Sequence, residues 1–537
     1  MKRLRFALLC NGNSLERWHL RCLDHLEQFA ELANVIVAPD HTSSLSSRTA
    51  STLMRSYAKR VDTRSTLDVT ERLAHVPRLP AEHVRSPGEG HAFDFVLKLG
   101  CVTTPPEVDS AARHGVWCFE HESVGDLLPF FREVYDGEEV TRAALLAFDA
   151  RPNGAAILGE GYFRTELRSY IASRDRVLDR IATWPARVCR RLLAGADRDS
   201  GGREPLEILP PRRPERRLRL LHFRAAIARR RLELAWERLF RHPQWNIGVL
   251  KVPAGAVLAP GAYADGDIEW FPLDDREGFL ADPFGIVRDG RLHILCEYFA
   301  YRESRGHICA LEYSGDGFTR QLAPVLPFPQ HVSYPFVLDG SDAIYCVPET
   351  SDANEVALFR AIEFPRRWSK IGVLVEDFAG VDPTVFLHEG RWWLLCTRKG
   401  PQEDVELWVW HASELLGPWT PHARNPVKTD VRCTRPGGSP FVHEGVLYRP
   451  TQDCSRSYGW RISVQRVLRL TPTEFAEEPV TVLEASPQSP FPDGRHTLTP
   501  VGDMVLVDGR RAVFAWPAFR AFLGIWAADL ARKVRRE

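Results

Sequence analysis

The stretch VDPTVFLHEGRWWLLCTRK, Val381 to Lys399, has the pattern of a β-hairpin. An Asp-Pro pair opens a run of β-forming residues, a Glu-Gly turn follows, and a second apolar run leads to a cysteine. The same pattern occurs earlier, at Val332 to Thr350 and at Ala281 to Phe299. The cysteines of the second runs recur every 50 residues: Cys296, Cys346 and Cys396.

Two later segments extend this series. Gly438 to Asp453 keeps the proline, the Glu-Gly turn and the second strand, and His496 to Trp516 is a weaker fifth copy. Five copies with a period of roughly 50 residues predict an all-β, five-bladed β-propeller over residues 242–516, with one four-stranded sheet per blade. A β-sandwich with accidental internal similarity is the alternative.

The composition sets broad limits on the class of protein. A chain of 537 residues exceeds a single core, and its 70 basic and 70 acidic residues give no argument for a nucleic-acid partner. The 11 cysteines include no C-x-x-C pair, which is typical of reduced thiols in the cytoplasm rather than of disulfides or a metal site. The apolar run near the N-terminus is too short for a secretory signal, and none reaches the length of a transmembrane helix.

Residues 1–190 have a different pattern, in which strands alternate with helices. RFALLCNG, NVIVAPD and FDFVLKLG have the character of strands, and LERWHLRCLDHLEQFAELA has helical periodicity. This order predicts an open, mostly parallel, Rossmann-like α/β sheet. Such sheets bind ligands beyond the carboxyl ends of their strands, which places Asn11 to Ser14 and the loop after Gly100 at a cleft.

Gly115 to Phe163 resembles the tetrahydrofolate-dependent formyltransferase family, through a strand after a Gly, a His-containing turn, a Leu-Leu-Pro and a later turn before a strand. The resemblance implies 10-formyltetrahydrofolate as cofactor and, in one alternative, a sugar amine as substrate. The family uses an Asn-x-His motif and a later Asp. Here Cys118 and Glu120 occupy the Asn and His positions, His121 follows one place late, and Asp149 is the nearest acid. Because a thiol and a carboxylate are poor replacements for these donors, a degenerate ligand-binding or structural domain is the other interpretation.

Two segments are basic and amphipathic. Residues 191–241 form an arginine-rich linker and helix, which we expect to be a solvated bridging helix whose apolar face, with Trp236, packs on a domain. Residues 517–537 are expected to form a C-terminal helix that packs on one of the domains. Contact with a membrane surface is the alternative for both segments.

The predicted propeller brings equivalent positions of different blades together around a central cleft. Asp282 and Asp382 each precede their blade's cysteine by 14 residues, Tyr334 has the corresponding place between them, and Glu349 follows Cys346 by three. Carboxylates beside aromatic residues suit a sugar ligand, although each Asp-Pro pair could simply cap a turn. The candidate substrate-binding residues are Trp270, His331, Tyr334 and Arg398; no metal ligands are predicted.

At these residues the chain resembles the five-bladed propellers of glycoside hydrolase family 43 and, over residues 242–516, the propeller region of plant glucosamine inositolphosphorylceramide transferases and related bacterial proteins. The resemblance implies that Asp282 is a general base and that Asp382 tunes acidity and orientation. The family's acidic Glu is replaced by Gly438 in Gly-Ser-Pro, so Glu349 is the tentative general acid.

The sequence thus predicts a carbohydrate-active protein, a transferase or glycosidase-like enzyme, that processes or recognises a glycan or a sugar-containing intermediate. Surface-polysaccharide or glycolipid assembly is the expected setting. The alternatives are a folate-dependent formyltransferase for a sugar amine and a non-catalytic glycan-binding module.

Overall fold

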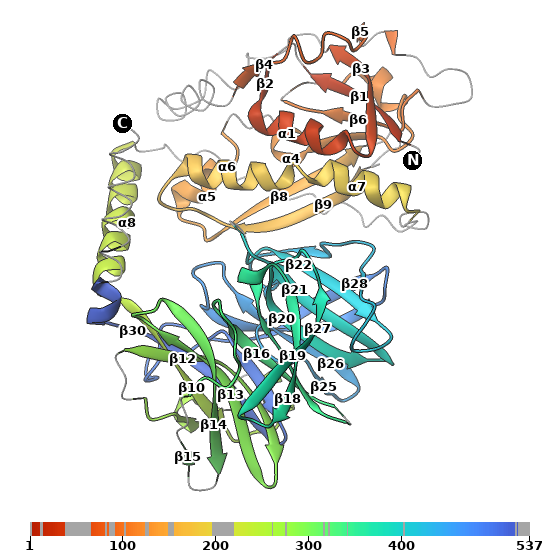
Figure 1. Ribbon diagram of the computed structural model, residues 1–537. Helices are drawn as coiled ribbons and strands as arrows, with labels where there is room; N and C mark the ends of the chain where they lie inside the picture. Colours follow the sequence, from red (N-terminus) through yellow and green to blue (C-terminus); the bar gives the residue numbers. More distant parts are fainter. Residues whose placement is uncertain are drawn as a thin grey trace. The chain divides into compact units, whose positions relative to one another are not determined.

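The computed structural model describes residues 3–10, 14–37, 66–80, 83–84, 92–100, 102, 104–123, 128–148, 155–195, 220–259, 261, 263–273, 277–314, 317–319, 323–340, 342–400, 403–520 and 524. The chain divides into two compact units, Met1–Arg231 and Leu232–Glu537 (Figure 1). Asp149, Asn11, most of the arginine-rich linker and most of the predicted C-terminal helix lie outside the described residues.

The first unit is built on a seven-stranded mixed sheet. Five strands run parallel and the last two run antiparallel to their neighbours, so the Rossmann-like assignment stays a prediction. Apolar strand residues such as Leu8, Val96 and Val116 are at most 1% exposed and form the core. In sheet order the strands are β5 (Arg78–Pro80), β3 (Ala30–Val37), β1 (Leu4–Cys10), β6 (Phe95–Lys98), β7 (Val116–Phe119), β8 (Val140–Phe148) and β9 (Ala155–Arg164); β2 (Ser14–Glu16) pairs with β4 (Thr66–Asp68).

The first unit also contains six described helices. The helix α1 buries Trp18, Cys22 and Leu26 on one face, as its predicted periodicity requires. Ser169 caps α6 by accepting a hydrogen bond from the backbone N–H of Ala172 at 3.3 Å. The helices are α1 (Arg17–Leu26), α3 (Pro106–Asp109), α4 (Glu120–Ser123), α5 (Phe131–Asp136), α6 (Tyr170–Ile181) and α7 (Trp184–Leu193).

The unit boundary falls within the long helix α8 (Leu220–Phe240). The described part of the basic stretch, residues 220–240, is helical, and Trp236, which was predicted to pack on a domain, is 60% exposed, with its ring centroid 4.4 Å from that of Phe240. Among the described residues, no helix has the length and apolar character needed to cross a membrane.

Within the described residues, the second unit contains five antiparallel sheets, four with four strands and one with five, in agreement with the predicted five-bladed propeller (Figure 1). The blade sheets are β12 (Gly278–Arg288), β13 (Arg291–Ala300), β14 (Arg305–Ser314) and β15 (Gly317–Thr319); β16 (Ser333–Asp339), β17 (Ile344–Glu349), β18 (Val356–Glu363) and β19 (Arg367–Val375); β20 (Gly380–His388), β21 (Arg391–Arg398), β22 (Glu406–Ala412) and β23 (Thr420–Pro421), with β24 (Lys428–Thr429) also on β22; and β25 (Phe441–His443), β26 (Val446–Asp453), β27 (Arg461–Leu470) and β28 (Phe475–Leu483).

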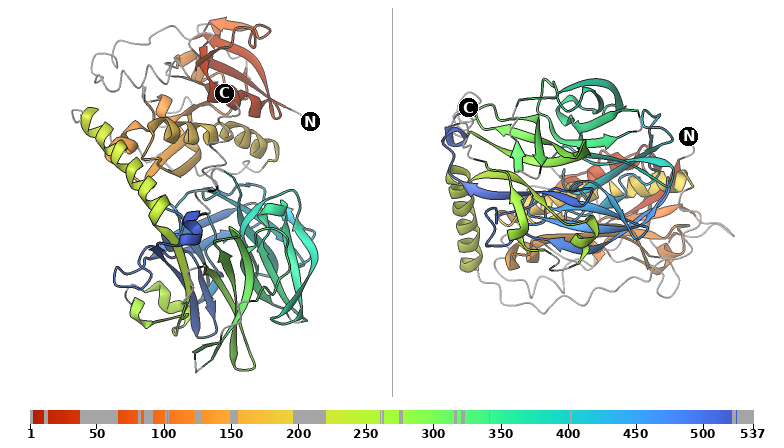
Figure 2. Two further views of the ribbon diagram at one scale, coloured as in Figure 1. Left: turned by 60° about the vertical axis from the view of Figure 1, so that its left-hand side comes forward. Right: turned by 90° about the horizontal axis from the view of Figure 1, so that it is seen from below.

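The fifth sheet joins the two ends of the propeller. It has the order β11 (Ile268–Trp270), β10 (His242–Leu250), β30 (Met504–Val513) and β29 (Leu498–Val501), so the first strand of the propeller pairs antiparallel with its last. Figure 2 shows the yellow-green β10 beside the blue β30. Closure of the ring removes the two free edges that an open series of blades would expose.

The hairpin predicted for Val381 to Lys399 is formed by β20 and β21. Its turn residues Glu389 and Gly390 both have positive φ, 49° and 72°, as a two-residue turn of type I′ requires. Asp289 with Gly290, and Glu444 with Gly445, repeat this turn in other blades. The predicted hairpins and their turns are therefore present.

A shared irregularity occurs in the first strands of three blades. Asp282, Tyr334 and Asp382 have φ values of 53°, 46° and 51°, each precedes a proline, and the strand pairing skips each of them. A residue other than glycine in the left-handed region costs free energy and is common at functional sites. This bulge takes the side chains of two predicted catalytic residues out of the regular strand alternation.

Candidate active site

A cavity of about 300 Å³ lies in the propeller unit, where the inner strands of several blades meet. Four buried carboxyl groups and the more exposed Glu403 line it, together with the aromatic rings of Phe279, Phe299 and Tyr458. All four carboxyl residues are at most 6% exposed. They are Asp282, Glu297, Glu349 and Asp382; His331, Lys399, Glu403 and Arg435 also line the cavity.

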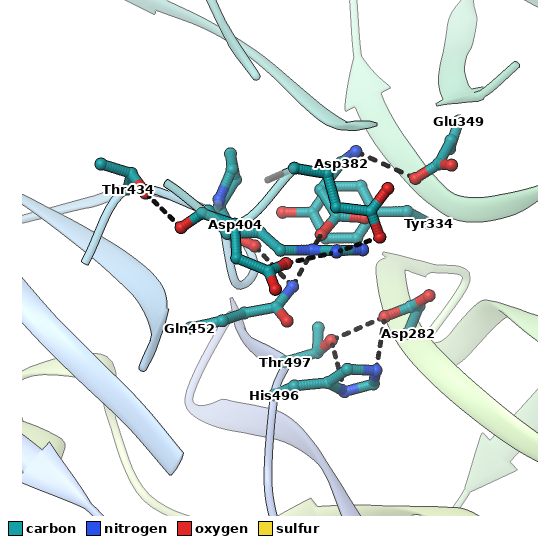
Figure 3. Close-up of polar contacts among 12 residues, drawn as sticks. Asp282, Tyr334, Glu349, Asp382, Asp404, Thr434, Gln452, His496 and Thr497 are labelled. Atoms are coloured by element: carbon teal, nitrogen blue, oxygen red, sulfur yellow. Dashed lines mark hydrogen bonds and ion pairs between the residues drawn. The ribbon is translucent and has the colours of Figure 1, made fainter. Parts of the chain in front are cut away.

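Asp282 reaches the cavity from the bulge in β12. Thr497 donates a hydrogen bond from its Oγ1 to Asp282 Oδ1 at 2.9 Å, and His496 Nε2 lies 3.6 Å from the same oxygen (Figure 3). Burial raises the pKa of Asp282 to about 6, although the charge of His496 acts in the opposite direction. At neutral pH this group is a carboxylate whose proton affinity is well above that of a solvated aspartate.

His496 is held between two carboxylates. Its Nδ1 lies 2.5 Å from Asp508 Oδ2, its Nε2 faces Asp282, and its ring stacks on Trp245 with centroids 3.9 Å apart. Burial alone would lower the pKa of His496, but Asp508 and Asp282 outweigh it and raise the pKa above the usual value.

The same three residues are a geometric candidate for a metal site, because Asp282, His496 and Asp508 offer ligand atoms within 4.8 Å of one another. A histidine ligand must offer a nitrogen lone pair, and an imidazolium has none. Both carboxylates stabilise the protonated ring of His496, so a metal ion would have to displace that proton before His496 could act as a ligand.

Asp382 reaches the cavity from the equivalent bulge in β20. Its Oδ2 accepts hydrogen bonds from Arg435 Nε at 2.6 Å and from Gln452 Nε2 at 2.7 Å (Figure 3). Burial raises the pKa of Asp382 to about 7, Arg435 lowers it, and Glu349 raises it again. Asp382 therefore exchanges its proton near neutral pH.

Arg435 connects several walls of the cavity. Besides Asp382, its guanidinium bonds Asp404 Oδ1 at 2.9 Å and lies 4.7 Å from the centre of the Tyr458 ring. The side chain is 7% exposed, so these acceptors and the ring replace the water that it loses.

Glu349, the tentative general acid, lies at the cavity as well, at the end of β17. Ser351 donates a hydrogen bond to its Oε1 at 2.7 Å, and the backbone N–H of Asp382 donates to its Oε2 at 3.1 Å. Both oxygens thus accept hydrogen bonds, and the contact with the backbone of Asp382 holds the bulge of β20 in place.

The predicted substrate-binding residues are only partly brought together. His331 lines the cavity, whereas Tyr334, Trp270 and Arg398 are not among the lining residues. Tyr334 is fully buried, and its hydroxyl accepts a hydrogen bond from the N–H of Gly438 at 2.8 Å. The Trp270 ring packs on that of Phe491 at 4.7 Å, and the Arg398 guanidinium lies over the Phe378 ring at 5.2 Å.

The site also contains residues that the sequence analysis missed. Phe299, Glu349 and Lys399 follow their blade's cysteine by three positions and all line the cavity, so this register is a signal that was used only for Glu349. Glu297 lies two residues before Phe299, on the same face of β13 by strand alternation. No repeat position marked the remaining residues: Arg435, Tyr458, His496 and Asp508.

The formyltransferase-like residues of the first unit show no comparable arrangement. Cys118 is buried on β7, where burial raises the pKa of its thiol to about 12. Glu120 pairs with Arg142 at 2.7 Å, and the His121 ring packs on Phe130 with centroids 5.1 Å apart. These contacts are structural, so the formyltransferase resemblance, and with it a folate cofactor, gains no support.

Comparison with known proteins places similarity in the propeller. Residues 273–490 match the family described as glucosamine inositolphosphorylceramide transferase 1, N-terminal. The transferase of that name from Oryza sativa subsp. japonica is 35% identical over 210 residues, which are 38% of this chain and 28% of the relative. The one from Arabidopsis thaliana is 36% identical over 215 residues, or 39% of this chain and 28% of the relative. The resemblance predicted for the propeller is thus confirmed within residues 273–490, and the chain spans little more than a quarter of these relatives.

Solved structures with some similarity to this chain include these two. A family 117 glycoside hydrolase from Zobellia galactanivorans has 15% identity and a TM-score of 0.33, over 51% of this chain and 91% of that chain. The catalytic domain of a Coprinopsis cinerea GH62 α-L-arabinofuranosidase has 13% identity and a TM-score of 0.30, over 49% of this chain and 80% of that chain.

Proposed function

We propose that the propeller cavity binds a sugar or a glycolipid-type glycan and that its carboxyl groups cleave or transfer a glycosidic bond. The observation that carries this proposal is the convergence of four buried carboxyl groups on one cavity of about 300 Å³. Burial of like charges is costly, and proteins maintain it mainly where a reaction needs groups that exchange protons.

The environment gives these groups different roles. A glycosidic bond is broken by a pair of carboxyl groups, of which one protonates the leaving oxygen and the other acts as base or nucleophile. Asp282, with a pKa of about 6, is ionised at neutral pH and can accept a proton from an attacking hydroxyl. Asp382 is held by Arg435 and Gln452 and positions the cavity wall beside it.

The remaining lining suits a sugar ring. Phe279, Phe299 and Tyr458 offer apolar faces for stacking, and Lys399 and Arg435 offer donors for hydroxyl groups. The name of the matched relatives specifies glucosamine and inositolphosphorylceramide, which supports a sugar or glycolipid substrate here. Since the match covers 28% of those proteins, transfer of that particular sugar is not inferred for this chain.

The test uses the full chain with a panel of 4-nitrophenyl glycosides in both anomeric forms, together with matched disaccharides. We expect turnover of at least one sugar type, and we expect Asp282→Asn to lower kcat/KM by about a hundredfold or more, because the base is lost. Asp503→Asn, at an exposed turn, is the matched control and should retain activity. Binding of a sugar in calorimetry without any turnover would assign the cavity to a glycan-binding module instead.

A further inference from the structure

Cleavage of a glycosidic bond needs a carboxylic acid that protonates the leaving oxygen. The hydrogen bonds of the cavity carboxyl groups show which of them has a buried oxygen without a partner. Asp282, Glu349 and Asp382 each have an oxygen that accepts hydrogen bonds from side chains or backbone of the site. Glu297 differs, because its buried Oε1 has no hydrogen-bond partner among the described residues. A buried carboxyl oxygen without a partner, in a residue that lines a cavity, calls for an explanation, and a catalytic role is one.

The position of Glu297 on β13 explains this isolation. The residue pairs with Ala281 of β12, directly before the Asp282 bulge, so the two carboxyl groups belong to adjacent strands of one blade. Gly306 of β14 permits the close approach of Oε1, since a Cβ at that position would lie 2.1 Å from it. The side chain is 6% exposed and faces the cavity.

The charges around Glu297 favour its neutral form. His331 Nε2 is 3.9 Å from Oε1, too far for a hydrogen bond, and His331 Nδ1 accepts from the N–H of Gly306 at 2.9 Å. The neutral imidazole therefore carries its proton on Nε2 and brings no full positive charge. Burial, followed by the charges of Asp282, Glu349 and Asp382, raises the pKa of Glu297 well above its usual value.

We propose that Glu297 is the proton donor of the propeller site, a role that rests on the proposed glycoside chemistry. Its carboxyl O–H transfers the proton to the glycosidic oxygen as the bond from that oxygen to the anomeric carbon breaks, with the electron pair remaining on oxygen. Water or an acceptor hydroxyl forms the new bond to the anomeric carbon and loses its proton to the Asp282 carboxylate. One proton thus passes from Glu297 to the leaving group and one from the nucleophile to Asp282.

The protonation of Glu297 can be measured without any substrate. Infrared spectra of the full chain labelled with ¹³C-glutamate separate protonated glutamic acid from protonated aspartic acid. We expect a protonated glutamate band at pH 7 that disappears in Glu297→Gln and persists in Glu484→Gln, whose side chain is 53% exposed. Absence of that band from the wild-type spectrum at pH 7 would overturn the proposal.

The kinetic arm tests the donor role. Glutamine has the shape and charge of the protonated acid, so Glu297→Gln should keep the wild-type melting temperature. We expect it to lower kcat on a disaccharide by about a hundredfold or more, and to retain most activity on the 4-nitrophenyl glycoside of the same sugar, whose leaving group needs little protonation. The alkaline fall of the pH profile should also disappear with that substrate.

The outcomes separate the two proposals. If the wild-type chain turns over the panel and Glu297→Gln slows both substrates equally or neither, another group donates the proton and only the donor role fails. If the wild-type chain turns over nothing, the proposed function fails, and the donor role fails with it. A loss confined to the disaccharide, together with the Glu297-dependent infrared band, supports the proposal.

Discussion

Arg435 is the main charge that favours the ionised form of Asp382. It binds Asp382 at 2.6 Å and Asp404 at 2.9 Å while almost fully buried. We expect Arg435→Met to lower the free energy of unfolding by about 3–5 kcal/mol, because it leaves buried carboxylates without their cation. Urea unfolding at pH 7 measures this loss. The double variant with Asp382→Asn should lose less than the sum of the two single variants, and strict additivity would contradict the coupling.

Residue by residue, the sequence allowed part of the site to be predicted. Asp282 and Asp382 were predictable because they occupy one position of a repeat, and equivalent positions of a propeller converge. Glu297, His496 and Arg435 could not be predicted, since they have no counterpart at the same position of other copies and reach the site only through tertiary structure. The spacing predicts that Glu349 lies at the cavity, as it does, but says nothing of the two donors that hydrogen-bond to its oxygens.

At the scale of elements, a glycine precedes the first strand of the fourth blade, β25, and lies against Leu498 of β29. Gly438 has a φ of 123°, and a Cβ there would lie 1.9 Å from the carbonyl oxygen of Leu498. We expect Gly438→Ala to reduce the free energy of unfolding by about 3 kcal/mol or more, since both backbone conformation and space exclude a side chain.

A matched turn glycine provides the control for this prediction. Gly390 has a φ of 72° but open space around its Cβ position, so Gly390→Ala should cost only about 1 kcal/mol from backbone strain. Chemical denaturation of both variants measures the difference. Equal losses would show that the contact with Leu498 has no energetic weight.

The elements also show why the register was easier to predict than the direction of side chains. The hairpin turns were predictable, because Glu-Gly and Asp-Gly pairs favour the positive φ values that these turns need. Tyr334 occupies the same bulge position as the two aspartates, yet its longer side chain is not part of the cavity lining: its hydroxyl lies 3.0 Å from Thr384 Oγ1 and accepts a hydrogen bond from the N–H of Gly438. The position in the repeat therefore predicts the backbone conformation of a residue, but not whether its side chain lines the cavity.

For the whole molecule, the raised carboxyl pKa values predict how stability depends on pH. Asp282 at about 6, Asp382 at about 7 and Glu297 above its usual value all bind protons more tightly in the folded chain than in the unfolded one. Between about pH 4 and 7 these three groups hold more protons in the folded chain, so their contribution to stability falls as pH rises. The raised pKa of His496 acts in the same direction, since its stabilisation is lost as pH rises through the folded value. Burial lowers the pKa of other histidines, which act in the opposite direction with smaller shifts: His242, His331, His411 and His422.

We expect the melting temperature of the propeller to be higher at pH 5.5 than at pH 8. Asp382→Asn should flatten this dependence, since each unit of pKa shift corresponds to about 1.4 kcal/mol. Differential scanning calorimetry from pH 5 to 8 measures both effects. A melting temperature that rises with pH over this range would contradict the assignment of the raised values.

The closing sheet gives a second prediction at this scale. A chain shortened to end before His496 lacks β29 and β30 and leaves β10 without its long partner. We expect it to lose cooperative unfolding of the propeller, measured by circular dichroism, because the ring stays open. A chain ending after Arg520 retains both strands and serves as the control, which should melt as the full chain does.

The pairing of β10 with β30 also determines when the site comes into being during synthesis. The ribosome makes β10 and Asp282 first, and His496 and Asp508 follow roughly 10–50 s later at ordinary elongation rates. During that interval the emerging chain has an open strand edge and an aspartate without its histidine. Each new molecule therefore passes through a period in which this strand edge is open to pairing with another chain and the proposed site is incomplete.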